Sequence, residues 1–222
     1  MPEASATFCS LVAAETGAVV VSLSYRFAPV HPFPAAIDDV DAALAWLRQH
    51  AAEEFGADPT LMTASGASAG GNLVLAASQQ IPSKEFAIRA AITFYAPVDL
   101  RPRPEDKPRP ASFPRTDPMS FIQPLYDSYA APSKAKDMDN PRMSPCLASE
   151  ETLPENMLLV VAAIDILVQE QLMFVERVKK ERKEKAPDIV VQVEKKMAML
   201  GKGLELIKRT HAQYDYRWER AS

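Results

Sequence analysis

Short apolar runs alternate with helix-patterned segments along this chain, and this alternation limits the fold more than any other feature. Buried strands are expected at 18–24, 60–65, 90–95, 157–161 and 189–193. Helical periodicity occurs at 36–54, 71–81 and 168–185, for example in the apolar residues Val168, Leu172, Val175 and Val178. Strands that are apolar on both faces and alternate with helices are typical of a parallel sheet. The sequence therefore predicts an α/β fold with a mostly parallel sheet.

The composition indicates one domain, 1–222, since 222 residues with 47% hydrophobic side chains can bury a core. A net charge of -4 argues against binding to nucleic acid or anionic membranes. The longest apolar stretch, 157–164, is too short to span a bilayer. Cys9 and Cys146 lack the spacing of metal ligands or of a disulfide framework. We therefore expect no metal and a reducing, cytoplasmic location.

Two segments have a distinctive composition. Residues 101–150 hold most of the prolines and no sustained periodicity, which predicts a long loop or a partial lid. Such a loop could cover a site or be a surface excursion only. The charged run 179–185 is interpreted as the solvated end of a helix.

The stretch from Gly66 to Gly71 has the form Gly-x-Ser-x-Gly between an apolar segment and a helix of small residues. This pattern is typical of a nucleophile elbow, in which a strand turns sharply into a helix and exposes a serine hydroxyl. Glycines suit the turn because the backbone there is strained and approaches its neighbours closely. Ser68 is thus a candidate nucleophile.

Several segments between Phe8 and Leu167 resemble the hormone-sensitive-lipase-like branch of the α/β-hydrolases, which includes bacterial esterases and arylacetamide deacetylases. The similar segments are 20–29 with 31–36 and Asp38-Asp39, 55–59, the elbow with Gly71-Asn72-Leu73, Asp139 to Pro145, and 162–167. The resemblance implies hydrolysis of a small or medium acyl ester, without a cofactor, by a triad in the chain order Ser, Asp, His. It assigns Ser68 as nucleophile and Asp165 as triad acid. The N–H of Ala69 is then one oxyanion donor.

The chain departs from this family at its N-terminal side. The family's His-Gly-Gly-Gly loop should lie upstream of Phe8, together with the first three strands, the third of which separates 18–24 from 60–65. We therefore expect an α/β-hydrolase sheet that is incomplete at the N-terminal side. Unpaired strand edges invite association, so a homodimer is plausible. Two carboxylates of the family pattern are also replaced, by Val30 and Ala67.

The general base does not follow the family pattern. The family's His-Gly-aromatic motif would fall at 199–206, where Lys202 or Gly201 stands instead. A lysine near its usual pKa is a poor base at neutral pH. The only downstream histidine, His211, lies on a helical stripe at 204–218 and is the candidate base, although such a histidine is more often a packing residue. His31 and His50 have no better claim.

Two alternatives to an esterase stay open. A non-catalytic ligand-binding protein is one, because the plant gibberellin receptor resembles these esterases and lacks the catalytic histidine. The other is an incomplete or altered reading of a longer hydrolase gene.

Overall fold

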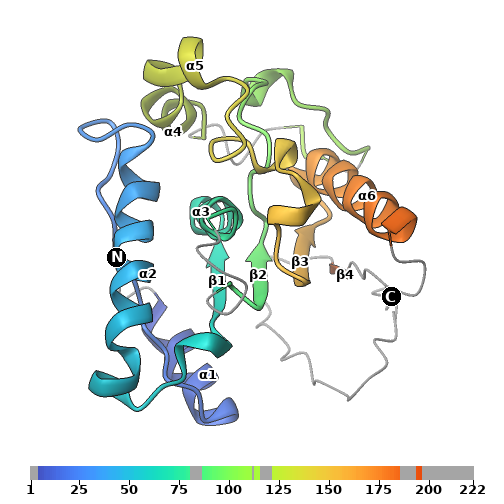
Figure 1. Cartoon of the computed structure of the whole chain (residues 1–222). Coiled ribbons are helices and arrows are strands. Elements are labelled where there is room, and N and C mark those ends of the chain that lie inside the picture. Colours follow the sequence, from blue (N-terminus) through green and yellow to red (C-terminus); the bar gives the residue numbers. More distant parts are fainter. Residues whose placement is uncertain (1–4, 81–86, 112, 116–121, 186–193, 197–222) are drawn as a thin grey trace.

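The computed structural model describes residues 5–80, 87–111, 113–115, 122–185 and 194–196, and every structural statement below refers to these residues. Its centre is a sheet with the strand order β1-β2-β3-β4, in which all neighbours are parallel. The strands are β1 (Thr63–Ala67), β2 (Ala90–Phe94), β3 (Asn156–Ala162) and β4 (Glu194–Lys196) (Figure 1). The predicted α/β class with a parallel sheet is confirmed. The predicted strand at 189–193 lies outside the described residues.

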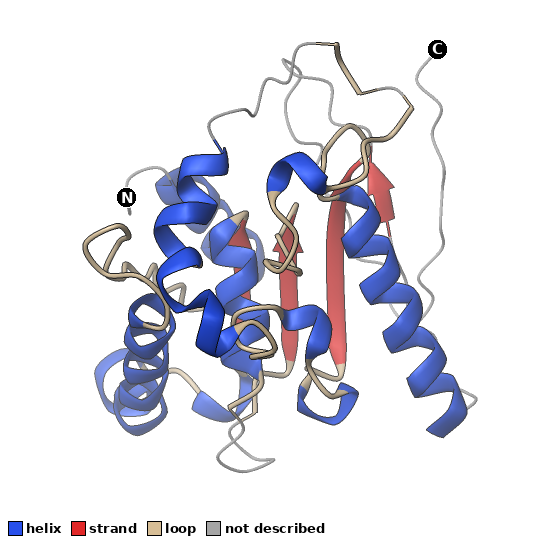
Figure 2. Ribbon diagram, turned by 90° about the horizontal axis from the view of Figure 1, so that it is seen from above, coloured by secondary structure: helices blue, strands red, loops and turns tan. Residues whose placement is uncertain are grey.

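Three long helices follow the predicted periodicity. They are α2 (Ala35–Phe55), α3 (Ala69–Ser78) and α6 (Val168–Lys185), and each lies within two or three residues of the range expected from the sequence. In Figure 2 the strands form the middle of the molecule and the helices surround them. α3 and α6 pack against the same face of the sheet, where the core includes Leu75, Ala91, Val161, Phe174 and Val178.

A second apolar cluster joins α2 to the other side of α3. It includes Phe33 just before α2, Ile37 and Leu44 on α2, and Leu73 and Ala77 on α3. α3 therefore has core contacts on two sides, and all its residues from Gly71 to Ser78 are buried. This burial fixes the helix that follows Ser68.

The proline-rich segment is more regular than the sequence indicates. It contains α4 (Ile122–Tyr129) and α5 (Ala131–Asp137), together with 3₁₀ turns at Pro104–Asp106 and Pro145–Leu147, and a further 3₁₀ turn, Glu150–Thr152, begins at its end. Helices this short give no sustained periodicity, so the pattern missed them. They are anchored, since Tyr129 packs edge-on against the Phe33 ring at 5.9 Å and Ser133 Oγ donates to the Phe33 carbonyl at 2.8 Å.

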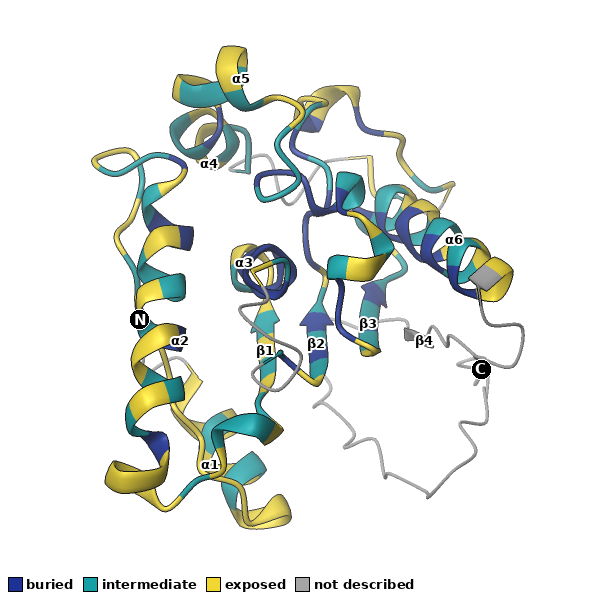
Figure 3. Ribbon diagram, viewed as in Figure 1, coloured by how far each residue is buried: buried dark blue, intermediate teal, exposed yellow. Residues whose placement is uncertain are grey.

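The strand predicted at 18–24 is wrong. This segment follows α1 (Ala6–Thr16) and the left-handed Gly17, and it is extended but unpaired and largely exposed (Figure 3). An apolar run forms a strand only beside a pairing neighbour. β1, at the edge of the described sheet, pairs with β2 and with no part of 18–24.

The charged run at 179–185 is only partly solvated. Arg182 is buried and binds Glu150 at 3.0 Å and the carbonyls of Pro154 and Glu155 at 2.6 and 2.8 Å. The prediction of a solvated helix end was therefore wrong for this residue. Its guanidinium joins the C-terminal half of α6 to the loop before β3.

Candidate active site

Ser68 lies at a sharp turn between β1 and α3. Its backbone has φ 52° and ψ −121°, in the left-handed half of the map that residues other than glycine rarely adopt. The turn is held from both sides, because the Ser68 N–H donates to the Phe94 carbonyl at 2.9 Å and the Ser68 carbonyl accepts from Gly71 N at 2.9 Å. Ser68 is exposed. A strained, exposed serine between a strand and a helix has the geometry of a nucleophile elbow.

The glycines around Ser68 have different roles. A Cβ on Gly66 would lie 2.4 Å from the carbonyl carbon and oxygen of Gly70, and one on Gly71 would lie 2.7 Å from Ala96 Cβ. A Cβ on Gly70 would meet nothing within 4 Å. Gly66 and Gly71 therefore let α3 pack closely on the sheet, whereas Gly70 has room for a side chain.

Asn72 fixes the start of α3 from inside the core. Its side-chain amide is buried and donates to the carbonyls of Pro97 at 2.9 Å and Met143 at 3.2 Å. One amide thus ties the helix after Ser68 to the segment after β2 and to the end of the proline-rich region. Each bond satisfies a carbonyl that burial would otherwise leave unpaired.

Asp165 lies at the same edge of the sheet as Ser68. The registers place Ala67, Phe94 and Val160 level, so β1 and β2 end together and β3 continues to Ala162 at the same edge. Ser68 follows β1 and half-buried Asp165 follows β3. Two strand spacings separate β1 from β3, about 10 Å, which leaves room for a side chain between the two residues.

Asp165 also has a local structural role. Its Oδ1 accepts from the Leu167 N–H at 3.0 Å, and its carbonyl accepts from the Val168 N–H at 3.4 Å. These bonds shape the turn from β3 into α6. A purely structural role as the cap of this turn is therefore the competing explanation for the residue.

Ala69 is the first residue of α3, so its N–H has no acceptor within the helix. It lies next to Ser68 and is exposed. The positive end of the helix dipole adds to the attraction for an anion at this point. The position suits a donor to an oxyanion.

Tyr95 was missed by the sequence analysis. It follows β2, between the strands that lead to Ser68 and Asp165, and it is 43% exposed with φ 41°. Its N–H donates to the Val160 carbonyl at 2.8 Å. A strained, exposed aromatic residue at this edge is a candidate substrate contact. Its place at the end of an apolar run was the signal that could have found it.

Neither of the two histidines in the described part of the chain is placed as a base at this edge of the sheet. His50 lies on α2, where its ring stacks on Trp46 at 4.7 Å and its Nδ1 lies 2.9 Å from the Trp46 carbonyl. His31 belongs to the turn before α2, and its backbone N–H donates to the Phe27 carbonyl. The predicted base His211 and its alternative Lys202 lie outside the described residues.

A buried ion pair supports the segment that follows β2. Lys107 Nζ binds the Glu170 carboxylate, the Asp99 carbonyl at 2.7 Å and the Tyr126 hydroxyl at 2.9 Å. Glu170 Oε1 also accepts from the N–H groups of Val98 and Asp99 at 2.9 and 3.2 Å. Burial raises the pKa of Glu170, and the Lys107 ammonium opposes this rise. The pair joins α6 to α4 and to the segment 98–107.

Cys146 is poorly suited to chemistry. Burial and the nearby Asp99 carboxylate raise the pKa of its thiol to about 12. The thiolate is the reactive form, so this cysteine is unreactive near neutral pH. Cys9 and Cys146 are both free thiols.

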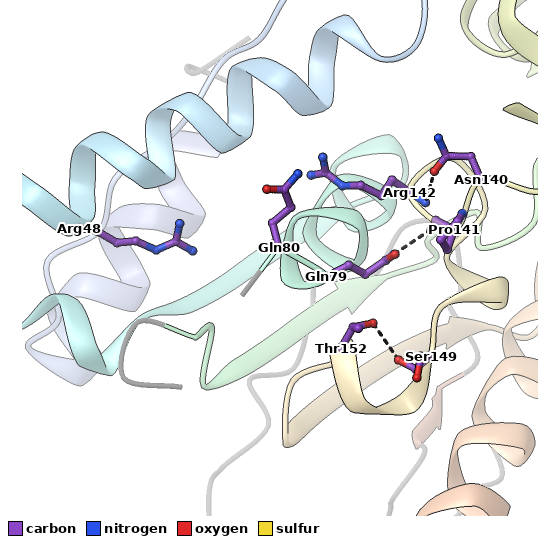
Figure 4. A pocket seen from close by; sticks show the side chains of 8 residues that line it. All are labelled: Arg48, Gln79, Gln80, Asn140, Pro141, Arg142, Ser149 and Thr152. Atoms are coloured by element: carbon purple, nitrogen blue, oxygen red, sulfur yellow. Dashed lines mark hydrogen bonds between the residues drawn. The ribbon is translucent and has the colours of Figure 1, made fainter. Parts of the chain in front are cut away.

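A cavity of about 640 Å³ lies near the opposite end of α3 from Ser68 (Figure 4). Its lining includes Arg48, Gln79, Gln80, Asn140, Pro141, Arg142, Ser149 and Thr152. Several of these groups already have structural partners. Gln79 Nε2 donates to the Pro141 carbonyl at 2.8 Å, and Arg142 binds Asp41 at 2.7 Å and the Ala76 carbonyl at 3.3 Å. The cavity is separate from the Ser68 edge, because α3 is about 15 Å long.

The described residues contain no group of three or more His, Cys, Asp or Glu side chains placed to hold a metal ion. Within the same part of the chain, no helix combines the length and the apolarity needed to cross a bilayer.

A strained serine elbow at the carboxyl edge of a parallel α/β sheet defines the class of α/β-hydrolases. The chain belongs to this family, since residues 1–194 match the family described as alpha/beta hydrolase fold. Among curated relatives, it is 48% identical over 65 residues to carboxylic ester hydrolase LipN of Mycobacterium tuberculosis, which is 29% of this chain and 17% of the relative. It is 52% identical over 64 residues to arylacetamide deacetylase of Oryctolagus cuniculus, 28% and 16% of the two chains. The chain thus matches under a fifth of these relatives' own length.

Solved structures give a longer match. The thermostable carboxylesterase EstE1, cloned from a metagenomic library, superposes with a TM-score of 0.69 and 26% identity over 89% of this chain and 65% of that one. A hyperthermophilic esterase from Pyrobaculum calidifontis gives a TM-score of 0.70 and 25% identity over 88% and 60%. This chain therefore shares its fold with esterases and covers less than two thirds of each of their chains.

Proposed function

We propose that this protein hydrolyses a carboxylic ester of small or medium acyl chain through Ser68. The observation that carries the proposal is the Ser68 elbow, with φ 52° and two neighbouring glycines that no larger residue could replace without a shift. The esterase names of the relatives support the substrate class.

In the first half of the reaction, Ser68 Oγ attacks the ester carbonyl carbon while a base takes the hydroxyl proton. The negative charge that forms on the carbonyl oxygen lies at the N-terminus of α3, where the Ala69 N–H donates to it. The C–O bond to the alcohol then breaks, and the protonated base gives its proton to the leaving alcohol. An acyl group remains on Ser68.

In the second half, water attacks the acyl carbon and the same base takes its proton. The bond between Ser68 Oγ and the acyl carbon then breaks, the base returns its proton to Oγ, and the carboxylic acid leaves. Asp165 orients the base and stabilises its protonated form. Metal and cofactor have no part in this scheme, which needs only the hydroxyl, the base, the carboxylate and the N–H donors.

Labelling with a fluorophosphonate probe and turnover of p-nitrophenyl esters of increasing acyl length test the nucleophile. Ser68→Ala is expected to abolish labelling and to lower kcat/KM by at least about 10³-fold, because the attacking oxygen is gone. Ser65→Ala is the matched control, since Ser65 is an exposed serine on β1, the strand that leads to Ser68. It is expected to keep both signals.

If the natural protein shows neither labelling nor turnover, the hydrolase proposal is wrong. Equilibrium dialysis or a thermal-shift screen with esters and carboxylic acids then tests the alternative of a ligand-binding protein. Binding that survives Ser68→Ala would favour that alternative.

The base is tested separately through His211. With a histidine base, kcat/KM should rise with pH through about 6.5, because the neutral imidazole accepts the proton. His211→Ala is expected to lower kcat/KM by at least about 10²-fold and to remove this rise. His50→Ala, on α2, should leave the pH profile unchanged. A profile that is the same with and without His211 would exclude this histidine as the base.

A further inference from the structure

The cavity beside the C-terminal end of α3 takes no part in the proposed reaction at Ser68. Its volume of about 640 Å³ lies within the range of roughly 300–1,000 Å³ that is typical of small-molecule sites. Its walls come from α2, from the end of α3 and from the segment 140–152 (Figure 4). Bonds hold these walls together, since Arg142 binds Asp41 of α2 at 2.7 Å and Gln79 of α3 donates to the Pro141 carbonyl at 2.8 Å.

The lining of this cavity is positive, although the chain as a whole has a net charge of -4. The charged residues among its described lining are Arg48 and Arg142, and no carboxylate is among them. Asp41 offsets part of the charge of Arg142, which leaves an excess of one positive charge. The other polar side chains of the lining are amides and hydroxyls. This combination attracts an anion and suits a ligand that also has hydroxyl groups.

Arg142 is held in place with donors left over. Its Nη2 binds Asp41 at 2.7 Å, and its Nε donates to the Ala76 carbonyl at 3.3 Å. Within the described part of the chain, neither Nη1 of Arg142 nor the side-chain amide of Gln80 makes a hydrogen bond. In Figure 4 the guanidinium of Arg142 points toward the Gln80 side chain. A guanidinium already fixed by two bonds loses little further freedom when a ligand binds, so its remaining N–H groups are prepared for an acceptor.

Arg48 adds a second cation to the same cavity. Asp41 and Arg48 are seven residues apart on α2, so they lie on one face of the helix, about 10 Å apart along its axis. The Arg48 side chain extends from α2 toward the end of α3 (Figure 4). A ligand that contacts both Arg48 and the Arg142 group held at Asp41 therefore has to be longer than a single inorganic ion. The cavity fits an organic molecule.

We propose that this cavity binds an organic anion, namely a phosphate or carboxylate group on a hydroxyl-bearing body, as in a sugar phosphate or a sugar acid. Arg142 Nη1 and the Gln80 amide donate to the oxygens of the anionic group. Arg48 contributes the second positive charge, and the hydroxyls of Ser149 and Thr152 lie where they can bond to the body of the ligand. This inference is independent of the proposed ester hydrolysis.

Isothermal titration calorimetry of the full chain tests the ligand class with four probes. Glucose 6-phosphate and gluconate each have an anionic group on a hydroxyl-bearing body, whereas glucose lacks the charge and inorganic phosphate lacks the body. At least one of the two organic anions is expected to have a dissociation constant about tenfold or more below those of both glucose and inorganic phosphate, because hydrogen bonds between arginine and an anion are strong. The tighter of the two identifies the preferred anionic group.

Two arginine variants test the location of the site. Arg48→Gln and Arg142→Lys should each raise the dissociation constant of the tighter anion at least about tenfold. Lysine at position 142 keeps a cation for Asp41 but removes the forked donors, and thermal unfolding shows whether each variant folds. Arg103→Gln is the matched control, because Arg103 pairs with Glu105 on the surface, outside the cavity. This control and Ser68→Ala should both leave the dissociation constant unchanged.

Three results would overturn the proposal. The first is that no probe binds with a dissociation constant below about 1 mM. The second is equal affinity for glucose and for the two organic anions, since the arginines would then contribute nothing. The third is an affinity that Arg48→Gln does not change, which would place the bound anion elsewhere on the molecule. Arg48→Gln decides this point even if Arg142→Lys fails to fold.

Discussion

Gly66→Ala is expected to lower the free energy of unfolding by about 3 kcal/mol or more. The new Cβ would lie 2.4 Å from two backbone atoms of Gly70 and 2.8 Å from Gly71 N, so α3 would have to move away from β1. Overpacking in a well-packed core usually costs about 1–3 kcal/mol, and here the atoms that must move are backbone atoms of a buried helix. Chemical denaturation followed by circular dichroism measures this change.

Gly70→Ala is the matched control two residues beyond the serine. Its Cβ would meet nothing within 4 Å, and alanine is favoured over glycine in a helix by up to about 1 kcal/mol. We expect stability that is equal to or slightly greater than that of the natural protein. Equal destabilisation by the two substitutions would contradict the close approach of α3 to β1 at Gly66.

Lys107→Met is expected to destabilise the fold by about 3–5 kcal/mol at neutral pH. The substitution keeps most of the side-chain volume but leaves the Glu170 carboxylate buried without its cation. Thermal and denaturant unfolding provide the measurement. Lys179→Met is the control, because Lys179 pairs with Glu176 on the exposed side of α6 at 3.4 Å and such pairs contribute little.

The effect of Lys107→Met should depend on pH in a definite direction. Burial raises the pKa of Glu170, and removal of Lys107 takes away the main opposing interaction. When the pKa of a carboxyl group is higher in the folded than in the unfolded protein, the folded protein loses stability as the pH rises from the unfolded to the folded pKa. The destabilisation should therefore shrink as the pH falls toward about 4.5 and grow above it.

The double variant Lys107→Met/Glu170→Gln separates charge from packing. Glutamine keeps an oxygen that can accept from the N–H groups of Val98 and Asp99, but it carries no charge. Much of the lost stability should return, and the pH dependence should disappear. A double variant as unstable and as pH-dependent as Lys107→Met would show that the charge of Glu170 is not the cause.

The sequence predicted the parallel sheet and its long helices because those signals are local. The spacing of Val168, Val175 and Val178 marks one face of α6, and the helix has the predicted bounds. The segment 18–24 has an equally clear apolar signal but no pairing neighbour, so its composition alone gave a wrong strand. Pairing depends on residues far away in the chain, and no local pattern reports it.

The candidate site was predictable where residue type determines its chemistry. Gly66, Ser68 and Gly71 together specify an elbow, and the geometry at Ser68 agrees with that expectation. The roles of Ser68, Asp165 and Ala69 stay predictions until they are tested, as does that of His211. Tyr95 and the buried pair of Lys107 and Glu170 could not be found from the sequence, because their roles come from the places to which the fold brings them.

The backbone conformation at position 68 would suit a glycine better than the serine that stands there. A left-handed conformation costs a residue other than glycine roughly 1–3 kcal/mol, and glycine adopts it freely. Glycine already stands at three of the positions between 66 and 71. Selection for stability alone would favour a fourth glycine at position 68. The Ser68 side chain therefore costs the protein folding free energy and does not contribute to it.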